Sequence, residues 1–201
     1  MWVVKLGGSL FHSKHLRDWL KVLADSGPLV VVPGGGPFAD QVRQAQQQLQ
    51  FDDSTAHLMA LLAMEQFGHL LCGLQPELTA ATNQTEIDEV LAQGDTPVWM
   101  PTRMVMADPG IQHSWDVTSD SLAAWLARQL CAKNLLLVKS LTLGREGMTL
   151  EALRQRDVVD SRFGDYLKRS GARGWIGSAN AYDNFKLHYR RGLAGATAIL
   201  D

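Results

Sequence analysis

The most constraining feature of this chain is a unit that occurs twice near its N-terminus: an apolar strand, a glycine-containing turn and an amphipathic helix. Residues 2–6 form a predicted buried strand, and apolar side chains over 16–23 then recur with helical spacing. A second apolar strand at 29–32 runs into three glycines, and the helical pattern resumes over 38–49. Strands that alternate with helices predict a mainly parallel sheet covered on both faces.

The same alternation continues along the chain. Its further predicted elements are a helix over 59–70, a strand at 98–100, a helix at 121–130, a strand at 135–138, helices near 150–154 and 162–170, and a strand near 174–176. No linker or low-complexity tract interrupts the 201 residues. We therefore expect residues 1–201 to form a single α/β domain.

Bulk composition argues against several classes of protein. The formal net charge of −2 at pH 7 gives no sequence-independent attraction to nucleic acid or to anionic lipid. The apolar runs fall far short of the roughly 20 residues that span a bilayer, so neither nucleic acid nor a membrane is an expected partner. Nothing like a signal peptide precedes the first strand, and the expected location is cytoplasmic.

Cysteine and histidine usage predicts no metal centre. Cys72 and Cys131 lie among aliphatic neighbours, where we expect buried thiols. The six histidines are scattered, and no Cys/His grouping has the spacing of a zinc site. We therefore assign no residue as a protein ligand of a metal.

Lys5, Gly7, Gly8 and Ser9 stand where the first predicted strand ends. Ligands of open parallel sheets bind beyond the carboxyl ends of the strands, and glycines there let backbone N–H groups approach a phosphate. Lys5 would add a compact positive charge. The alternative is an ordinary strand-ending turn beside a lysine whose stem lies along apolar surface, and this motif alone leaves both interpretations open.

Gly34, Gly35 and Gly36 also follow a strand and precede a helix, whose N-terminal N–H groups and dipole favour an anion. Three consecutive glycines cost backbone entropy on folding, so a simple tight turn would rarely use them all. Neither glycine motif has the spacing of a Walker A loop or of a dinucleotide-binding fingerprint. A phosphate or acceptor contact is the favoured interpretation, and a purely structural turn is the alternative.

Trp115, Asp116, Thr118, Ser119 and Asp120 form a mainly polar cluster at the start of a predicted helix. Helix capping is an equally good explanation for the hydroxyl residues. A single cap needs a single side chain, however, and the cluster also contains two carboxylates. A carboxylate close to two phosphate sites could orient a catalytic lysine or hold Mg²⁺, so Asp120 is the candidate for that role.

Lys139 and Ser140 end the strand predicted at 135–138. A lone lysine after a strand is usually a solvated loop charge, but here other strand ends already carry candidate phosphate-binding groups. Lysines and glycine-rich backbone at the ends of separate strands suit phosphoryl transfer by positioning and charge neutralisation, without a covalent nucleophile.

These motifs together resemble the amino acid kinase family, which includes acetylglutamate, aspartate, carbamate and uridylate kinases. The resemblance rests on Lys5-Leu6-Gly7-Gly8-Ser9, Pro33-Gly34-Gly35-Gly36, Thr118-Ser119-Asp120-Ser121-Leu122-Ala123-Ala124 and the strand that carries Lys139. It implies a three-layer αβα sandwich with a mainly parallel central sheet and with ATP and Mg²⁺ as cofactors. It also implies an acceptor-binding half over about 1–115 and a nucleotide-binding half over about 116–201.

The resemblance further implies roles for individual residues. Lys5 would stabilise the transferring phosphoryl group, and Asp120 would orient Lys5. The expected cofactor-binding residues are Gly7, Gly8, Ser9, Lys139 and Ser140. The expected acceptor-binding residues are Gly34, Gly35, Gly36, His57, Arg103, Trp115, Asp116, Thr118 and Ser119.

Segments 56–66, 101–104 and 114–121 resemble in particular a short branch of the family linked to methanofuran-type cofactor synthesis. Enzymes of that branch phosphorylate an aminomethyl-furanmethanol phosphate, which is the small-molecule acceptor we expect. A phosphorylated acceptor needs extra positive charge, and Arg103 is the candidate that the sequence offers. Family members commonly pair through a helix, so a homo-oligomer formed through 59–71 is expected, with a simple core helix as the alternative.

Two departures from the family pattern leave alternatives open. The chain lacks the Gly-Gly-Met segment and second lysine that hold ATP phosphates in many members, and Arg145, Lys139 or Lys168 are candidate substitutes. Residues 140–144 also replace the usual acidic loop. The rival hypotheses are a kinase for uridylate or another family acceptor, and a non-catalytic module that binds a nucleotide or oxyanion.

Overall fold

A computed structural model describes residues 1–141, 147–183, 185 and 196–200. Its centre is an eight-stranded sheet in the order β3-β4-β2-β1-β5-β7-β8-β6. The strands are β1 (Trp2–Leu6), β2 (Leu29–Pro33), β3 (Leu78–Ala81), β4 (Thr96–Trp99), β5 (Asn134–Lys139), β6 (Met148–Thr149), β7 (Arg173–Ser178) and β8 (Thr197–Leu200). From β3 through β7 in that order all strands run parallel, and β8 is antiparallel to β7.

Helices lie on both faces of the sheet, so the predicted α/β fold is confirmed. They are the 3₁₀ helix η1 (Gly8–His12), α1 (Leu16–Ala24), α2 (Gly36–Leu49), α3 (Asp53–Leu74), α4 (Gln84–Gln93), α5 (Thr102–Met106), α6 (Ser119–Gln129), α7 (Leu150–Gln155) and α8 (Phe163–Ser170). Successive strand side chains point to opposite faces. Val3 accordingly packs in the core with α6 and α8, whereas Val4 packs in the core with α1.

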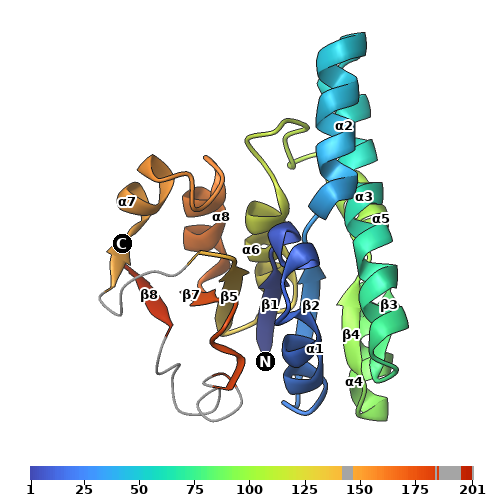
Figure 1. Cartoon of the computed structure of the whole chain (residues 1–201), viewed down its shortest axis with the longest axis vertical. Coiled ribbons are helices and arrows are strands. Elements are labelled where there is room, and N and C mark those ends of the chain that lie inside the picture. Colours follow the sequence, from blue (N-terminus) through green and yellow to red (C-terminus); the bar gives the residue numbers. More distant parts are fainter. Residues whose placement is uncertain (142–146, 184, 186–195, 201) are drawn as a thin grey trace.

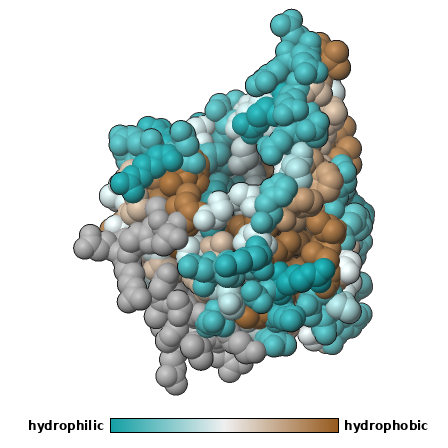
Figure 2. Space-filling model, viewed as in Figure 1, coloured by the Kyte–Doolittle hydropathy of each residue, from teal (hydrophilic) through white to brown (hydrophobic). Residues whose placement is uncertain are grey.

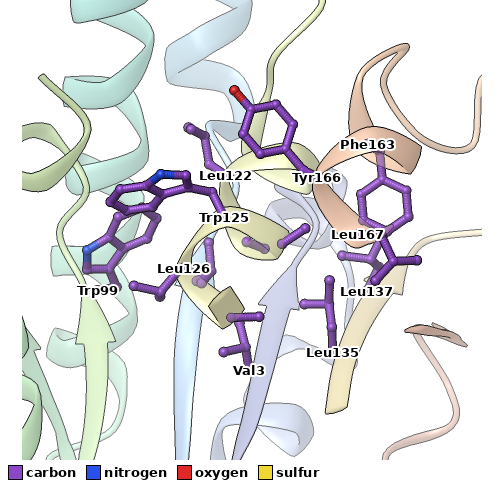
Figure 3. Packing of buried hydrophobic residues seen from close by; sticks show 14 of the residues in the cluster. Val3, Trp99, Leu122, Trp125, Leu126, Leu135, Leu137, Phe163, Tyr166 and Leu167 are labelled. Atoms are coloured by element: carbon purple, nitrogen blue, oxygen red, sulfur yellow. The ribbon is translucent and has the colours of Figure 1, made fainter. Parts of the chain in front are cut away.

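The core beneath α6 is built from side chains that are far apart in sequence. Trp99 of β4 and Trp125 of α6 stack with ring centroids 5.9 Å apart, and Leu167 of α8 lies over Leu137 of β5 (Figure 3). Each large apolar side chain buried in this way stabilises the fold by about 1.5–3 kcal/mol relative to an exposed one. This packing holds α6, and hence its first turn, against the central strands.

The α2–α3 hairpin extends beyond the carboxyl ends of the strands, and the loop that precedes α6 reaches up to it (Figure 1). Pro37 lies in the first turn of α2, and Gln50 ends that helix in a left-handed conformation. Asp52 then caps α3, since its side chain accepts a hydrogen bond from the backbone N–H of Thr55 at 2.9 Å. The described residues contain no helix that is both long and apolar enough to cross a membrane.

The predicted elements agree with the structure where the apolar pattern is strong, and the omissions are the short or polar ones. Strand β3, helices α4 and α5, and the strand pair β6 and β8 were not predicted. Helix α4 has few apolar residues, and only Ile87 and Val90 are buried. The strand β3 has only four residues, so its sequence pattern is too short to predict a strand, and its pairing with β4 is seen only in the structure.

The prediction that both cysteines are buried is wrong for Cys131. Cys131 follows the C-cap of α6 with φ of 49° and is exposed, because the chain must turn there before it enters β5. Cys72 is half-buried on α3, and desolvation raises the pKa of its thiol to about 11. The aliphatic neighbourhood in sequence therefore did not translate into burial at the helix end.

Candidate active site

The two glycine loops contact each other above the ends of β1 and β2. A Cβ atom on Gly8 would overlap the backbone nitrogen of Gly36, and a Cβ atom on Gly34 would overlap the backbone of Gly8. Gly36 also has a φ of 54°, a conformation that other residues rarely adopt. Much of the glycine requirement at these positions therefore comes from the close approach of the loops.

A further glycine is fixed by the neighbouring strand. Gly7 donates a backbone hydrogen bond to the carbonyl of Val138 at 2.9 Å, and a Cβ atom on Gly7 would lie 2.8 Å from that oxygen. Gly34 donates to the carbonyl of Leu6 at 2.8 Å. The hydrogen bonds of Gly7 and Gly34 thus join the carboxyl ends of β1, β2 and β5. Both glycines are buried.

Lys5, Asp120 and Lys139 form a buried charge cluster at the ends of β1, α6 and β5. The Lys5 Nζ lies 2.9 Å from Asp120 Oδ1, and the Lys139 Nζ lies 2.6 Å from Asp120 Oδ2. The side chains of Lys5 and Asp120 are each 5% exposed. Two lysines and one carboxylate leave one excess positive charge, which suits an anionic phosphoryl group.

The protonation behaviour of this cluster follows from burial and charge. Burial alone would raise the pKa of Asp120, but the two lysines outweigh it and lower this pKa to about 2. Burial, together with the charge on Lys139, lowers the pKa of Lys5 in spite of the Asp120 carboxylate. Asp120 is therefore an ionised acceptor at neutral pH and holds both ammonium groups in fixed positions.

Asp160, which the sequence analysis did not identify, holds the first turn of α6. Its carboxylate accepts hydrogen bonds from the backbone N–H and hydroxyl of Thr118, at 2.9 and 2.8 Å, and from the backbone N–H of Ser121 at 3.0 Å. The hydroxyl of Ser121 also donates to it. Burial and the charge on Asp120 raise the pKa of Asp160. No local pattern around residue 160 signals this role, because its partners lie about forty residues earlier.

A pocket of about 440 Å³ opens beside this cluster, between the glycine loops, α2, α3 and the segment before α6. The predicted site residues that line it are Gly8, Ser9, Gly35, Gly36, His57, Trp115, Thr118 and Ser119. Its remaining wall is largely apolar and includes Leu61, Met64 and Leu122. One concave site therefore brings together residues from three of the predicted motifs and His57.

The lining also contains residues that the sequence analysis missed, among them Arg43 on α2. The Arg43 guanidinium lies over the ring of Trp115, 4.2 Å from its centroid. The indole N–H of Trp115 donates to Gln46 Oε1 at 2.6 Å. The spacing of Arg43 from the glycines, which places it two helical turns further along α2, was the available signal for its position.

His57 stacks on His113 inside the same region, with ring centroids 4.7 Å apart and an interplanar angle of 8°. Ser54 Oγ and His113 Nδ1 are 2.8 Å apart and hydrogen-bonded. Burial, and secondarily the neighbouring His113, lowers the pKa of His57 to about 4. His57 is therefore neutral at pH 7. Its buried Nε2 has no hydrogen-bond partner within the part of the chain that the structure describes.

Other predicted site residues lie outside this pocket. Arg103 is on α5 with its side chain 69% exposed, and it pairs with Glu86 at 3.9 Å. Asp116 accepts a hydrogen bond from the Ser161 hydroxyl at 2.9 Å. Among the described lining residues the guanidinium belongs to Arg43 of α2, and no residue of α5 is one of them.

Ser140 lines a second, open hollow of about 390 Å³ that also includes Lys14 and Asn180. Ser9 and His12 line both this hollow and the larger pocket, so η1 separates the two. Of the candidates for the second lysine, Lys139 is in the charge cluster, Lys168 lines a different depression next to Asp160, and Arg145 lies outside the described residues.

The arrangement fits a polyphosphate better than a protein-bound metal. The glycine loops, the N-terminus of α2 and the paired lysines supply N–H donors and positive charge. Within the described ranges no group of three or more His, Cys, Asp or Glu side chains could hold a metal ion. Any Mg²⁺ would accordingly depend on phosphate oxygens for most of its ligands.

The family model described as "Amino acid kinase family" matches residues 1–141, which includes both glycine loops and all three members of the charge cluster. The chain belongs to the amino acid kinase family. A curated relative is the [5-(aminomethyl)furan-3-yl]methyl phosphate kinase of Methanocaldococcus jannaschii, with 27% identity over 140 residues. That match covers 68% of this chain and 64% of the relative. The resemblance to the family and to this branch is thus confirmed.

Solved structures support the same fold for this member of the amino acid kinase family. The uridylate kinase of Archaeoglobus fulgidus superimposes with a TM-score of 0.73 at 17% identity, and the match covers 100% of both chains. An isopentenyl phosphate kinase in a substrate complex gives a TM-score of 0.65 at 15% identity, again over 100% of both chains. The three-layer αβα sandwich is therefore the fold of this family member.

Proposed function

We propose that this chain transfers the γ-phosphoryl group of ATP to a small phosphorylated acceptor. The observation that carries the proposal is the buried Lys5–Asp120–Lys139 cluster beside a pocket walled by two glycine loops. Phosphoryl transfer needs positioning and neutralisation of charge on the moving group, with no covalent nucleophile. The excess positive charge of the cluster and the N–H groups of the loops supply both.

In this proposal each residue of the cluster has a separate task. Lys5 neutralises charge on the transferring phosphoryl group, and Lys139 does so on the phosphates of the donor. Asp120 fixes both ammonium groups before the substrates arrive, so little reorganisation is needed during the reaction. ATP, with Mg²⁺ bound to its phosphates, supplies the phosphoryl group.

The acceptor is proposed to lie in the 440 Å³ pocket, and the nucleotide on the other side of η1 near Ser140 and Lys139. Residues 1–115 would then supply most of the acceptor site, and 116–201 most of the nucleotide site. Thr118, Ser119 and Leu122 also line the acceptor pocket, so the two halves meet there.

An aminomethyl-furanmethanol phosphate is the acceptor that we favour. The relative from Methanocaldococcus jannaschii is a kinase for such a compound. The pocket has the size of a small-molecule site and combines an aromatic wall at Trp115 with apolar side chains, which suits a small flat ring. The apolar wall and the Arg43–Trp115 stack are the specific features that favour this acceptor over carbamate, which is much smaller.

The decisive experiment is acceptor-dependent release of ADP from Mg-ATP. Aminomethyl-furanmethanol phosphate, uridylate, carbamate and acetylglutamate would be supplied one at a time. Turnover with the furan phosphate alone is the expected result. Turnover with uridylate instead would assign another acceptor within the family, and ATP binding without ADP release from any acceptor would favour a non-catalytic nucleotide-binding module.

A further inference from the structure

The acceptor pocket has two chemically different ends. One end, at the glycine loops, adjoins the lysine cluster and the N-termini of α2 and α6. The other end lies further along α2 and is lined by Asp40, Arg43, Asp53 and Trp115. Arg43 follows the start of α2 by seven residues, which corresponds to roughly 10 Å along the helix axis. A small acceptor can therefore reach both ends at once.

Gln46 connects the groups at this second end. Its Oε1 accepts the indole N–H of Trp115 at 2.6 Å, and its Nε2 donates to Asp53 Oδ1 at 2.9 Å. Because an indole N–H can only donate, the orientation of the Gln46 amide is fixed by this contact. The same Nε2 also donates to the backbone carbonyl of Phe51 at 3.2 Å. Gln46 on α2 thus positions two groups: the Asp53 carboxylate on α3 and the Trp115 ring in the loop before α6.

Asp40 and Asp53 are both exposed, and neither residue is the N-cap of its helix. Asp52, and not Asp53, caps α3, since Asp52 accepts both the backbone N–H and the hydroxyl of Thr55. The side chain of Asp40 makes no hydrogen bond or ion pair with any residue that the structure describes, and the Asp53 carboxylate accepts a hydrogen bond from Gln46. Carboxylates that line a pocket and form no ion pair with another described residue are available to recognise a cationic ligand.

The charges of the pocket are arranged as a dipole. The reaction end carries the excess positive charge of the lysine cluster and two helix N-termini. The far end carries Asp40 and Asp53 against Arg43, whose guanidinium is stacked on Trp115. The side chains at the far end therefore carry one excess negative charge, and the N-terminus of α3 lies beside them at Asp53. An acceptor with an anion at one end and a cation at the other is oriented by this field, and uridylate has no cation to match it.

We propose that Asp40 and Asp53 recognise a cationic amine on the acceptor, and that Gln46 positions Asp53 and Trp115 for this contact. The acceptor class is then a flat ring with a phosphate at one end and a protonated amine at the other. This inference rests on the proposed phosphoryl transfer in the same pocket. It adds the residues that distinguish one acceptor from another. The lysine cluster and the glycine loops bind phosphate groups, which many acceptors share.

Two acceptors of matched shape isolate the contribution of the amine. Aminomethyl-furanmethanol phosphate and its hydroxymethyl analogue differ only in the exchange of an ammonium for a hydroxyl. The ratio kcat/KM would be measured with both for the wild type, Asp40→Asn and Asp53→Asn. Asp88→Asn is the matched control, because Asp88 is an exposed carboxylate on α4, outside the pocket.

The wild type and the Asp88→Asn control are expected to prefer the amine about tenfold to a hundredfold, the usual effect of a charge-assisted hydrogen bond. Asp53→Asn and Asp40→Asn should each lose most of that preference while their kcat/KM with the hydroxymethyl analogue stays near that of the wild type. Equal losses with both acceptors, or a wild type without preference, would overturn the inference.

Gln46→Leu tests the positioning role, with Gln48→Leu, an exposed glutamine on the same helix, as its control. We expect Gln46→Leu to raise KM for the aminated acceptor about tenfold, with kcat nearly unchanged. A KM equal to that of the control would remove Gln46 from the proposal.

A failure of the inference can be told apart from a failure of the proposed function. If the wild type releases no ADP with either acceptor, phosphoryl transfer to a furan phosphate is wrong. Calorimetric titration with the two acceptors then still decides the recognition. Amine-selective binding that is lost in Asp53→Asn supports the inference, and equal binding of both acceptors overturns it.

Discussion

Asp120 Oδ1 lies 2.9 Å from Lys5 Nζ, so the first turn of α6 is joined by an ion pair to the carboxyl end of β1. The other carboxylate oxygen is taken by Lys139 at 2.6 Å. Charged groups that are buried together are costly to separate, because removal of one partner leaves the other uncompensated. The shared carboxylate explains why two lysines tolerate burial side by side.

Lys5→Ala is predicted to lower kcat by about 10³-fold or more while the protein stays folded. Lys139 still pairs with Asp120 in this variant, so the carboxylate is not left alone. Lys133→Ala is the control, since Lys133 is exposed and directly precedes β5, at the end of the strand opposite Lys139. Steady-state kinetics and the thermal unfolding midpoint would be measured together. Near-normal turnover of a folded Lys5→Ala protein would refute the assignment.

Gly8→Ala is predicted to destabilise the protein by about 2 kcal/mol or more and to abolish activity, because the added methyl group would overlap the backbone of Gly36. Gly73→Ala is the matched control: Gly73 lies within α3, and a methyl group added there would have nothing within 4 Å. This change should stabilise the protein by up to about 1 kcal/mol. Urea unfolding of both variants checks the pair, and equal behaviour would contradict the argument.

Asp160→Ala is predicted to lower the free energy of unfolding by about 2 kcal/mol and kcat about tenfold, because the first turn of α6 loses its hydrogen-bond acceptor. The loss of kcat follows because that turn carries Asp120. Asp165→Ala is the control, since its ion pair with Arg162 is on the surface and should change stability by less than about 0.5 kcal/mol. An unchanged kcat in Asp160→Ala would show that α6 does not need this contact.

His57 gives a pH dependence of stability. Its pKa is about 4 in the folded protein and near 6.5 in an unfolded chain, so the unfolded state takes up the proton first. The free energy of unfolding should therefore fall as the pH drops from about 6.5 toward 4. Between pH 6.5 and 5 the contribution is on the order of 1 kcal/mol.

His57→Gln should remove this contribution, whereas His69→Gln, a change at an exposed histidine on the same helix, should retain it. Urea unfolding of the three proteins at pH 7.5 and pH 5 provides the comparison. Parallel loss of stability in wild type and His57→Gln on acidification would show that another group is responsible.

Leu62 offers a test of self-association. Its side chain is 44% exposed on α3, and hydrophobic surface follows the edge of the molecule where α3 lies (Figure 2). We propose that this face pairs with a second copy, so Leu62→Lys should convert a dimer to a monomer in sedimentation velocity. Leu49→Lys, at the exposed end of α2, should leave the dimer intact. A wild type that is monomeric at every concentration would rule the pairing out.

The sequence by itself determined the parallel core and the chemistry at the strand ends. Apolar strands such as Trp2–Leu6 and Asn134–Lys139 are buried on both faces, which leaves a continuous apolar signal followed by a charged or glycine residue. Carboxyl ends of parallel strands meet at one edge, so Lys5 and Lys139 were predictable neighbours. Asp120 was predictable because a single cap could not account for its whole polar cluster.

Only the tertiary structure decided which residues surround that chemistry. Asp160 contacts residues of α6 that lie about forty positions earlier, and the guanidinium in the pocket is that of Arg43 and not of Arg103. Gln46 of α2 accepts a hydrogen bond from Trp115, which lies in the loop before α6. Gly34 and Gly36 are packed against Gly8, and Gly35 is packed against Ala39, so contacts within the protein also require these glycines. Local patterns record burial and backbone preference, whereas these contacts depend on how helices and loops pack, which no short stretch of sequence encodes.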